Sequence, residues 1–316
     1  MVVKRKRREM TFILLFLSHN RKVVSWFLAI IVSSFALLPG KGKSICAESV
    51  LTPRPFASLQ LRLIHDGFDS SEIRALYSRS EVTFQQQDVV AYFMHKEAAL
   101  NYEQFLTQPS IKEATEYLKK NGCLLRKAQH LYGVEPEIIT AIMLVESRFG
   151  TCVGKHLVFN TLSTLAALAD EANRNRLWHI RVKRKMPGSK AKFNRWANQK
   201  STWAYRELKA LLRYVKSQKI DPFSLYGSYA GAMGFAQFIP SSVLEFGQDG
   251  NRDGHINLCQ QEDAISSIAN YLKQHGWRLG LSRDKALEIL LYYNQSTYYA
   301  DTILKVAKRL SRTTLN

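Results

Sequence analysis

Apolar residues recur at helical spacing along most of the chain from about residue 57 onward. A spacing of i, i+3, i+4 and i+7 places these side chains on one face of a helix, where they can pack into a core. Strand-like alternation is scarce, and no internal repeat is present. The pattern therefore predicts a mainly α-helical fold, with helices in the segments 59–64, 73–77, 111–118, 124–131, 265–272, 286–293 and 303–310.

The most apolar helical segment runs from Pro136 to Val145 and leads directly into Glu146. Proline suits the first turn of a helix, and Gly150 is a typical residue to follow its end. Because the segment has almost no polar face, we predict that this helix passes through the core.

Glu146 is the main candidate for acid catalysis. The end of a helix carries partial negative charge, and apolar Val145 and Phe149 would reduce the solvation of an ionised carboxylate. Both effects are expected to raise the pKa of Glu146, as a proton donor requires, whereas a pairing with Arg148 would lower it. The alternative is a glutamate that turns into solvent as the helix ends, and this segment alone does not decide between them.

A second unusual segment, residues 226–242, reads YGSYAGAMGFAQFIPSS. Glycines at 227, 231 and 234 let the backbone approach a neighbour or a ligand closely, and Pro240 predicts the start of another helix. A tightly packed connection would have the same composition. The segment does not match the GxxxxGK[ST] pattern of a phosphate-binding loop.

Five segments, in order along the chain, carry a resemblance to a known family. They are VESRFG at 145–150, GSYAGAMGFAQFIPSS at 227–242, DGNRDGHINL at 249–258 followed by Asp263, ANYLKQHGW at 269–277 and YNQSTYYA at 293–300. With these segments the chain resembles the membrane-bound lytic murein transglycosylase B family. The resemblance implies a lysozyme-like helical catalytic core. It also implies cleavage of peptidoglycan glycan strands between N-acetylmuramic acid and N-acetylglucosamine, leaving 1,6-anhydromuramoyl ends.

The resemblance also implies which residues form the site. Glu146 matches the single catalytic acid and base, while the family more often has Thr and Tyr where this chain has Ser147 and Phe149. We expect an N-terminal helical region at about 55–133 and a catalytic core at about 134–316. The residues implied to line the sugar cleft are Ser228, Tyr229, Met233, Gln237, Tyr293 and Asn294.

A single carboxyl group suffices for the implied reaction. Ordinary glycosidases use two carboxyl groups about 5 to 9.5 Å apart, and the next acids after Glu146, Asp170 and Glu171, lie in no recognisable motif. Under the resemblance, Glu146 protonates the glycosidic oxygen and then removes the proton of the C6 hydroxyl. Two alternatives stay open: a muramidase-type hydrolase of the same bond, and a non-catalytic peptidoglycan-binding protein of the envelope.

The segment 249–255 begins like an EF-hand, with oxygen ligands at positions 1, 3 and 5, glycine at 6 and a backbone carbonyl at 7. Position 12 is Gln260, which cannot replace the usual bidentate glutamate. The resembled family closes a longer loop with an aspartate, and Asp263 fits that spacing. We expect a structural Ca²⁺ and no cofactor for catalysis, with a solvated turn as the alternative. The candidate ligands are Asp249, Asn251, Asp253, His255 and Asp263.

Two basic blocks account for most of the formal charge of +19, with +8 in residues 1–47 and +9 in residues 172–195. The second block, a basic insert at about 172–200, also contains Trp178, Phe193 and Trp196. Cations between aromatic residues are typical of single-strand nucleic-acid binding, which is disfavoured in an exported protein. A solvated face and attraction to an anionic wall polymer or substrate remain.

The first block predicts export. A basic start precedes an uncharged apolar run of 16 residues at 23–38, shorter than the roughly 20 residues that span a bilayer. Residues 1–47 are therefore interpreted as a signal, cleaved or lipidated near Cys46, with a retained membrane anchor as the alternative. We expect a periplasmic monomer, with residues 48–316 as the transglycosylase domain. The remaining cysteines, Cys123, Cys152 and Cys259, are interpreted as small buried hydrophobes.

Overall fold

The computed structural model describes residues 55–95, 100–185 and 188–314, with side chains described as far as residue 312. The described residues belong to one compact unit. The predicted export segment, residues 1–47, lies outside them. Among the described residues, no helix has both the length and the apolar character needed to cross a membrane.

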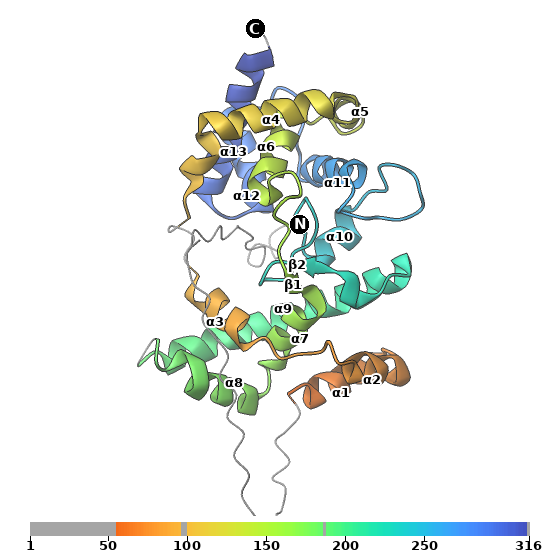
Figure 1. The fold of residues 1–316 in the computed structure, drawn as a ribbon, viewed down its shortest axis with the longest axis vertical. Coiled ribbons are helices and arrows are strands. Elements are labelled where there is room, and N and C mark those ends of the chain that lie inside the picture. Colours follow the sequence, from red (N-terminus) through yellow and green to blue (C-terminus); the bar gives the residue numbers. More distant parts are fainter. Residues whose placement is uncertain (1–54, 96–99, 186–187, 315–316) are drawn as a thin grey trace, which may run out of the picture. The chain divides into compact units, whose positions relative to one another are not determined.

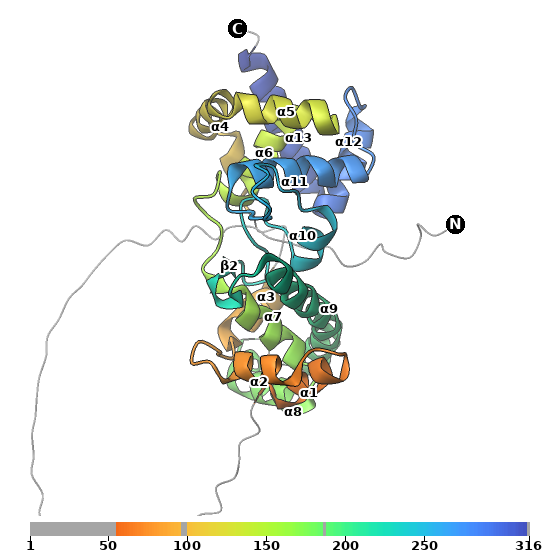
Figure 2. The same ribbon diagram turned by 90° about the vertical axis from the view of Figure 1, so that its right-hand side faces the viewer.

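The described chain is mainly helical, as the apolar spacing predicts (Figures 1 and 2). Its two short strands pair antiparallel, with His156 opposite Gly227 and Leu157 opposite Tyr226. The elements are α1 (Ala57–His65), α2 (Ser70–Ser78), α3 (Gln86–Met94), η3 (Tyr102–Leu106), α4 (Gln108–Lys120), α5 (Gly122–Tyr132), α6 (Pro136–Ser147), β1 (His156–Leu157), α7 (Val158–Ala167), α8 (Glu171–Leu177), η4 (Trp178–Val182), α9 (Lys190–Gln218), η5 (Pro222–Ser224), β2 (Tyr226–Gly227), α10 (Pro240–Phe246), α11 (Gln261–Gln274), α12 (Arg283–Tyr293) and α13 (Thr297–Thr314).

Local sequence explains where many of these helices begin and end. Pro136 and Pro240 start α6 and α10, as predicted. The Asp69 side chain accepts hydrogen bonds from the amides of Ser71 and Glu72 at 2.8 and 2.9 Å and so caps α2. Gly133 ends α5 in the left-handed conformation, which glycine adopts without strain.

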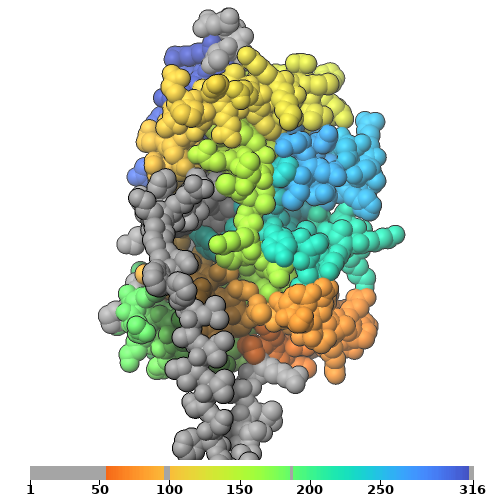
Figure 3. Space-filling model, in the orientation of Figure 1, coloured from red at the N-terminus to blue at the C-terminus, as the bar shows by residue number. Residues whose placement is uncertain are grey.

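Helix α6 runs through the core, as its apolar composition predicts. Every residue from Ile138 to Ser147 is buried. Its largest contact is with α13, and α4 and α5 also pack against it. Helices α4 and α5 form the yellow surface in Figure 3. The prediction of a core helix that leads into Glu146 is therefore confirmed, and the helix extends to Ser147.

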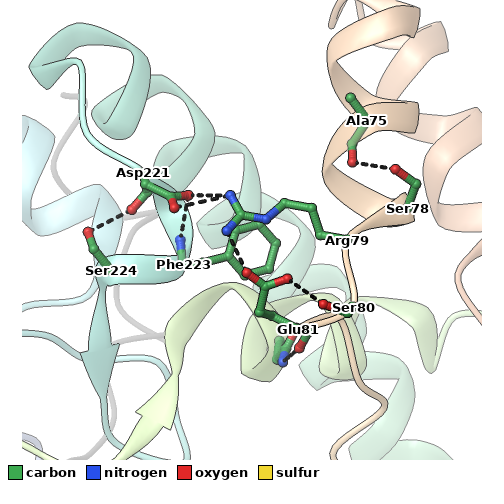
Figure 4. A network of polar contacts seen from close by, with 9 residues as sticks. Ala75, Ser78, Arg79, Ser80, Glu81, Asp221, Phe223 and Ser224 are labelled. Carbon is green, nitrogen blue, oxygen red and sulfur yellow. Dashed lines mark hydrogen bonds and ion pairs between the residues drawn. The ribbon is translucent and has the colours of Figure 1, made fainter.

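A polar network joins the N-terminal helices to the segment that follows α9 (Figure 4). The guanidinium of Arg79 lies between two carboxylates, 2.6 Å from Glu81 and 2.9 Å from Asp221. The same guanidinium covers the ring of Phe223 at 4.0 Å from its centroid. Phe223 belongs to η5, which leads into β2 and the glycine-rich segment. The network therefore holds the chain in place where it leads into the glycine-rich segment.

Candidate active site

Glu146 lies in the last turn of α6 and is 3 % exposed. The interpretation of a glutamate that turns into solvent is therefore wrong. Arg148 follows in the left-handed conformation, with φ of 44°. Its guanidinium lies 3.4 Å from the Glu113 carboxylate and donates to Gln104 at 3.3 Å. Arg148 thus forms its ion pair with Glu113, on α4.

Two tyrosines share the surroundings of Glu146. Burial, and then the negative charge of Glu146, raise the pKa of Tyr293 and of Tyr299 well above the usual value. Their rings are stacked, with centroids 6.2 Å apart. Tyr299 is fully buried, and its hydroxyl approaches Glu146, whose carboxylate also raises the pKa of Tyr299 by accepting a hydrogen bond from it. Sequence reasoning did not select Tyr299, although it lies in the same YNQSTYYA motif as Tyr293.

The glycine-rich segment meets the end of α6 and the end of α12. The Ser147 hydroxyl donates to the carbonyl of Phe235 at 2.9 Å, and the Tyr293 hydroxyl donates to the carbonyl of Ala236 at 2.6 Å. Gly150 lies so close to the Phe235 ring that a Cβ there would be 2.3 Å from it. Three segments that are far apart in sequence are therefore joined around Glu146.

Three of the predicted cleft residues hold the glycine-rich segment in shape. The Ser228 hydroxyl accepts from the amides of Ala230 and Ala232 at 3.1 and 3.2 Å. Met233 is buried, and its amide donates to the carbonyl of Phe238 at 2.9 Å. Gln237, with φ of 47°, donates from Nε2 to the carbonyl of Gly234 at 2.8 Å and more weakly to that of Val153.

Besides Tyr293, described above, the predicted cleft residues include Tyr229 in the glycine-rich segment and Asn294 at the end of α12. Tyr229 is half-buried, and its hydroxyl lies 3.0 Å from Nδ1 of His95. Its ring meets the ring of Tyr92 edge-on, with centroids 5.6 Å apart. Asn294 is 2 % exposed at the end of α12, where Oδ1 accepts from the amide of Ser296 at 3.0 Å. The partly exposed ring of Tyr229 offers an apolar face of the kind that packs against a sugar.

The loop predicted to bind calcium is closed by hydrogen bonds to its own backbone. Asp249 accepts from the amides of Asp253 and Gly254 at 3.1 and 2.8 Å. Asp263 is fully buried in the first turn of α11 and accepts from Gly250 and Asn257 at 2.8 and 2.6 Å. Asn251 donates to Asp253 at 2.9 Å, and the amide of His255 donates to Asp253 at 2.8 Å.

The donor chemistry of this loop fits a hard cation, since carboxylates, an amide and a backbone carbonyl supply only oxygen. Burial raises the pKa of Asp263, and the charge of Asp249 acts in the same direction. Within the described part of the chain, however, no group of three or more His, Cys, Asp or Glu side chains is arranged to hold a metal ion. Because a hard cation takes oxygen ligands, the backbone carbonyl of His255, and not its imidazole, is the candidate ligand.

The cysteines differ from their prediction. All three described cysteines are free, but Cys123 and Cys259 are exposed and Cys152 is half-buried. Cys123 lies in the first turn of α5 and Cys259 in the loop before α11. Their interpretation as small buried hydrophobes was therefore wrong. The type of a residue alone does not tell whether it lies on the buried or on the exposed face of a helix.

A profile of the transglycosylase SLT domain family matches residues 53–289, which is more than half of the chain. The chain belongs to this family. Membrane-bound lytic murein transglycosylase B of Escherichia coli is 34 % identical over 178 residues, which are 56 % of this chain but only 42 % of that protein. The chain thus spans about two fifths of the length of this curated relative.

Solved structures of lytic transglycosylases share the fold of this SLT-domain chain. Soluble lytic transglycosylase SltB1 of Pseudomonas aeruginosa is 24 % identical with a TM-score of 0.66, over 83 % of this chain and 99 % of that one. Lytic transglycosylase Slt35 of Escherichia coli, solved in complex with calcium, is 22 % identical with a TM-score of 0.64, over 83 % and 94 %. The predicted lysozyme-like helical class and the family resemblance are confirmed.

Proposed function

We propose that this SLT-domain protein is a peptidoglycan lytic transglycosylase that cleaves the bond between N-acetylmuramic acid and N-acetylglucosamine. The observation that carries the proposal is the placement of Glu146, buried at the end of α6 and surrounded by Tyr293, Tyr299 and the glycine-rich segment. The family match and the name of the Escherichia coli relative support the same activity.

The chemistry proposed needs one carboxyl group that acts twice. Protonated Glu146 donates its proton to the glycosidic oxygen as the bond to C1 of the muramic acid breaks. The carbonyl oxygen of the substrate's own N-acetyl group stabilises the positive charge at C1. The carboxylate of Glu146 then removes the C6 hydroxyl proton as O6 attacks C1, which closes the anhydro ring and restores the acid.

The surroundings of the next acids in sequence support a lone carboxyl group. Asp170 caps α8, where it accepts from the amide of Ala172 at 2.8 Å and from the Ser58 hydroxyl at 3.1 Å. Glu171 is exposed in the first turn of α8. An ordinary hydrolase would need a second carboxylate about 5 to 9.5 Å from Glu146. Asp170 and Glu171 are thus engaged on α8, and together with the family match this favours the lyase over the muramidase-type hydrolase.

The decisive test combines Glu146→Gln with an analysis of products. The substitution keeps the size of the side chain but removes the transferable proton, and we expect a loss of turnover of about 10²-fold to 10⁴-fold. Glu137→Gln, in the first turn of the same helix, is the matched control and should keep the parent rate. Mass spectrometry of digested sacculi should find anhydro ends. Reducing ends would identify a hydrolase, and a fully active Glu146→Gln would refute the assignment of Glu146.

We also propose that the loop between Asp249 and Asp263 binds a structural Ca²⁺. The oxygen-only donor set and the calcium in the Slt35 complex support this proposal. Asp249, Asn251, Asp253, the His255 carbonyl and Asp263 would hold the ion. It would have no part in the bond cleavage.

For location, we propose that the protein acts outside the cytoplasm, because its substrate lies there. Peptidoglycan strands are the proposed partner, with attachment to a membrane through residues 1–47 as an alternative to a cleaved signal. The name of the Escherichia coli relative includes membrane binding. Microscopy of the full chain fused to a fluorescent protein that folds outside the cytoplasm would show a peripheral signal. A uniform cytoplasmic distribution of the fused protein would contradict the proposal.

A further inference from the structure

The basic insert folds with its aromatic side chains turned inward. Trp178 is 4 % exposed and Phe193 is fully buried. The ring of Phe193 lies 5.9 Å from Trp178, 6.1 Å from Trp196 and 5.2 Å from Phe93 on α3, measured between centroids. These contacts attach η4 and the first turns of α9 to the body of the protein. Trp178 and Phe193 therefore anchor the segment and are not available to stack on bases, while the partly buried ring of Trp196 packs against Phe93 and Phe193.

The cations of the same segment face solvent. Arg174 is the exception, because its guanidinium donates to the carbonyls of Leu168 and Ala169 at 2.7 Å each. The other eight are exposed, and within the described residues none of them forms an ion pair. We call these eight the basic face: Arg176, Arg181, Lys183, Arg184, Lys185, Lys190, Lys192 and Arg195. Part of it forms the green surface at the lower left of Figure 3.

The charge of the basic face is local and does not reflect a general excess. Residues 172–195 carry +9 and contain no acid, while the chain outside this block and residues 1–47 carries only +2. Exposed like charges repel one another, which opposes folding unless a partner neutralises them. A surface of this kind attracts a polyanion over about 10 Å at 0.1 M salt.

The surface chemistry selects among polyanions. Single-stranded nucleic acid is recognised by stacking on exposed aromatic rings, and here Trp178 and Phe193 are buried and Trp196 is partly buried against Phe193. An interfacial membrane segment presents several large apolar residues, whereas Ile180, 45 % exposed, is the one large apolar side chain exposed within the described part of this segment. A hydrated polymer with spaced carboxylates requires neither feature.

We propose that the basic face is a second, non-catalytic docking surface for peptidoglycan, and that it binds the carboxylates of the stem peptides. This inference rests on the proposed function for the identity of the polymer. The basic face holds the protein on the anionic wall by many weak, solvent-screened contacts. The site around Glu146 acts on the uncharged glycan bond. Binding to intact wall should therefore depend on salt more strongly than turnover of a short glycan does.

The test uses the full chain and purified insoluble sacculi, with bound protein measured by co-sedimentation. The triple variant Lys183→Gln, Arg184→Gln, Lys185→Gln removes three charges from the basic face. The matched control Lys112→Gln, Lys119→Gln, Lys120→Gln removes three exposed charges from α4. At about 0.02 M salt we expect binding on the order of tenfold weaker for the first variant and unchanged binding for the control. Both should cleave short soluble glycan fragments at the parent rate.

A second arm identifies the ligand. Sacculi whose carboxylates have been converted to neutral amides should bind the parent protein as weakly as untreated sacculi bind the triple variant of the basic face. If both triple variants lost binding to sacculi equally, only the net charge of the protein would matter, and the proposal would be overturned. Undiminished binding of the parent protein to amidated sacculi would also overturn the proposal. The same holds if the triple variant of the basic face loses binding only to anionic phospholipid vesicles and not to sacculi. Because binding is measured without turnover, a failure of the lyase assignment would leave this result readable.

Discussion

At the last turn of α6, Glu146 is surrounded by groups with opposing effects on its charge. The negative end of the helix and burial both favour the neutral acid. The phenol hydroxyl of Tyr299 favours the ionised form, because it can donate to the carboxylate, whereas the Tyr293 hydroxyl already donates to the carbonyl of Ala236. A residue that gives up a proton and later takes one back must be stable enough in both forms. The surroundings of Glu146 provide for each.

Removal of the Tyr299 hydroxyl should expose this balance. In Tyr299→Phe the ionised form of Glu146 loses a neighbouring donor, so the fall of activity at alkaline pH should move to higher pH. We expect kcat to fall about tenfold, comparable with the loss of one hydrogen bond of about 1.4 kcal/mol. Tyr298→Phe is the control, because Tyr298 is 61 % exposed. An unchanged pH–rate profile for Tyr299→Phe would show that Tyr299 only fills space.

Lys200 provides a second prediction, on stability. Its ammonium donates to the Tyr92 hydroxyl at 2.8 Å and lies over the rings of Tyr92 and Trp203. Burial lowers the pKa of Lys200 to about 8. The unfolded chain, with a lysine pKa near 10.4, therefore binds more protons between these values. The free energy of unfolding of the parent should rise relative to Lys200→Met as pH increases from about 8 to about 10.

The size of this effect is bounded by the pKa difference, at about 3 kcal/mol, and water around the partly exposed amine will reduce it. Denaturant titrations of both proteins at several pH values measure it. Lys190→Met, which removes an exposed amine, is the control and should follow the parent. If the free energies of unfolding of the parent and Lys200→Met changed with pH in the same way, the prediction would be contradicted.

At the scale of elements, the sequence predicted helices with one apolar face and missed others. Helix α7 is buried along its whole length, so it has no polar face to produce a periodic pattern. Two of its polar residues have partners inside: the amide of Asn160 donates to the carbonyl of Glu81 at 2.7 Å, and the Ser163 hydroxyl lies 2.8 Å from the Tyr77 hydroxyl. Helix α9 was not predicted either, and its first turns lie in the run of cations. The contacts of Asn160 and Ser163 depend on tertiary packing, which the spacing of residues along the chain does not encode.

The candidate site shows the same division. The apolar run before Glu146 predicted its burial, because the cause lies in adjacent residues. The proximity of Tyr299 arises where α13 packs against α6, and no local pattern predicts that contact. The family resemblance selected Ser228 and Gln237 as cleft residues. The structure adds that both hold the glycine-rich segment in shape through hydrogen bonds to its backbone.

A glycine pair tests the packing of this segment. Gly154 and Gly276 have nearly the same φ, 93° and 96°, so alanine should cause similar backbone strain at each. A Cβ at Gly154 would lie 2.1 Å from the carbonyl oxygen of Gly227, whereas one at Gly276 meets nothing within 4 Å. In denaturant titrations, we expect Gly154→Ala to lower the free energy of unfolding by about 1 to 3 kcal/mol more than Gly276→Ala does. Equal losses would mean that the segment shifts freely.

At the scale of the whole molecule, the predicted calcium loop connects three parts of the fold. The backbone carbonyl of Ile256 accepts from the Tyr214 hydroxyl at 2.6 Å, and its amide donates to Oε1 of Gln218 at 2.8 Å. Both partners lie on α9. The carbonyl of Leu258 accepts from Phe235 of the glycine-rich segment at 2.8 Å. Asp263 lies at the start of α11. An ion held in this loop would therefore stabilise the molecule as a unit.

Calcium should raise the thermal stability of the full chain. A ligand that binds only the folded state at 100 times its dissociation constant stabilises it by about 2.7 kcal/mol, which corresponds to a rise in Tm of about 5 °C or more. Calorimetry with added Ca²⁺ and with a chelator measures this rise. Asp249→Asn should abolish it, whereas Asp284→Asn, an exposed acid in the first turn of α12, should preserve it. Since the ion would act through the fold and not the chemistry, turnover well below Tm should change little with the chelator. A Tm that does not respond to Ca²⁺ would leave the loop as a solvated turn closed by its own backbone.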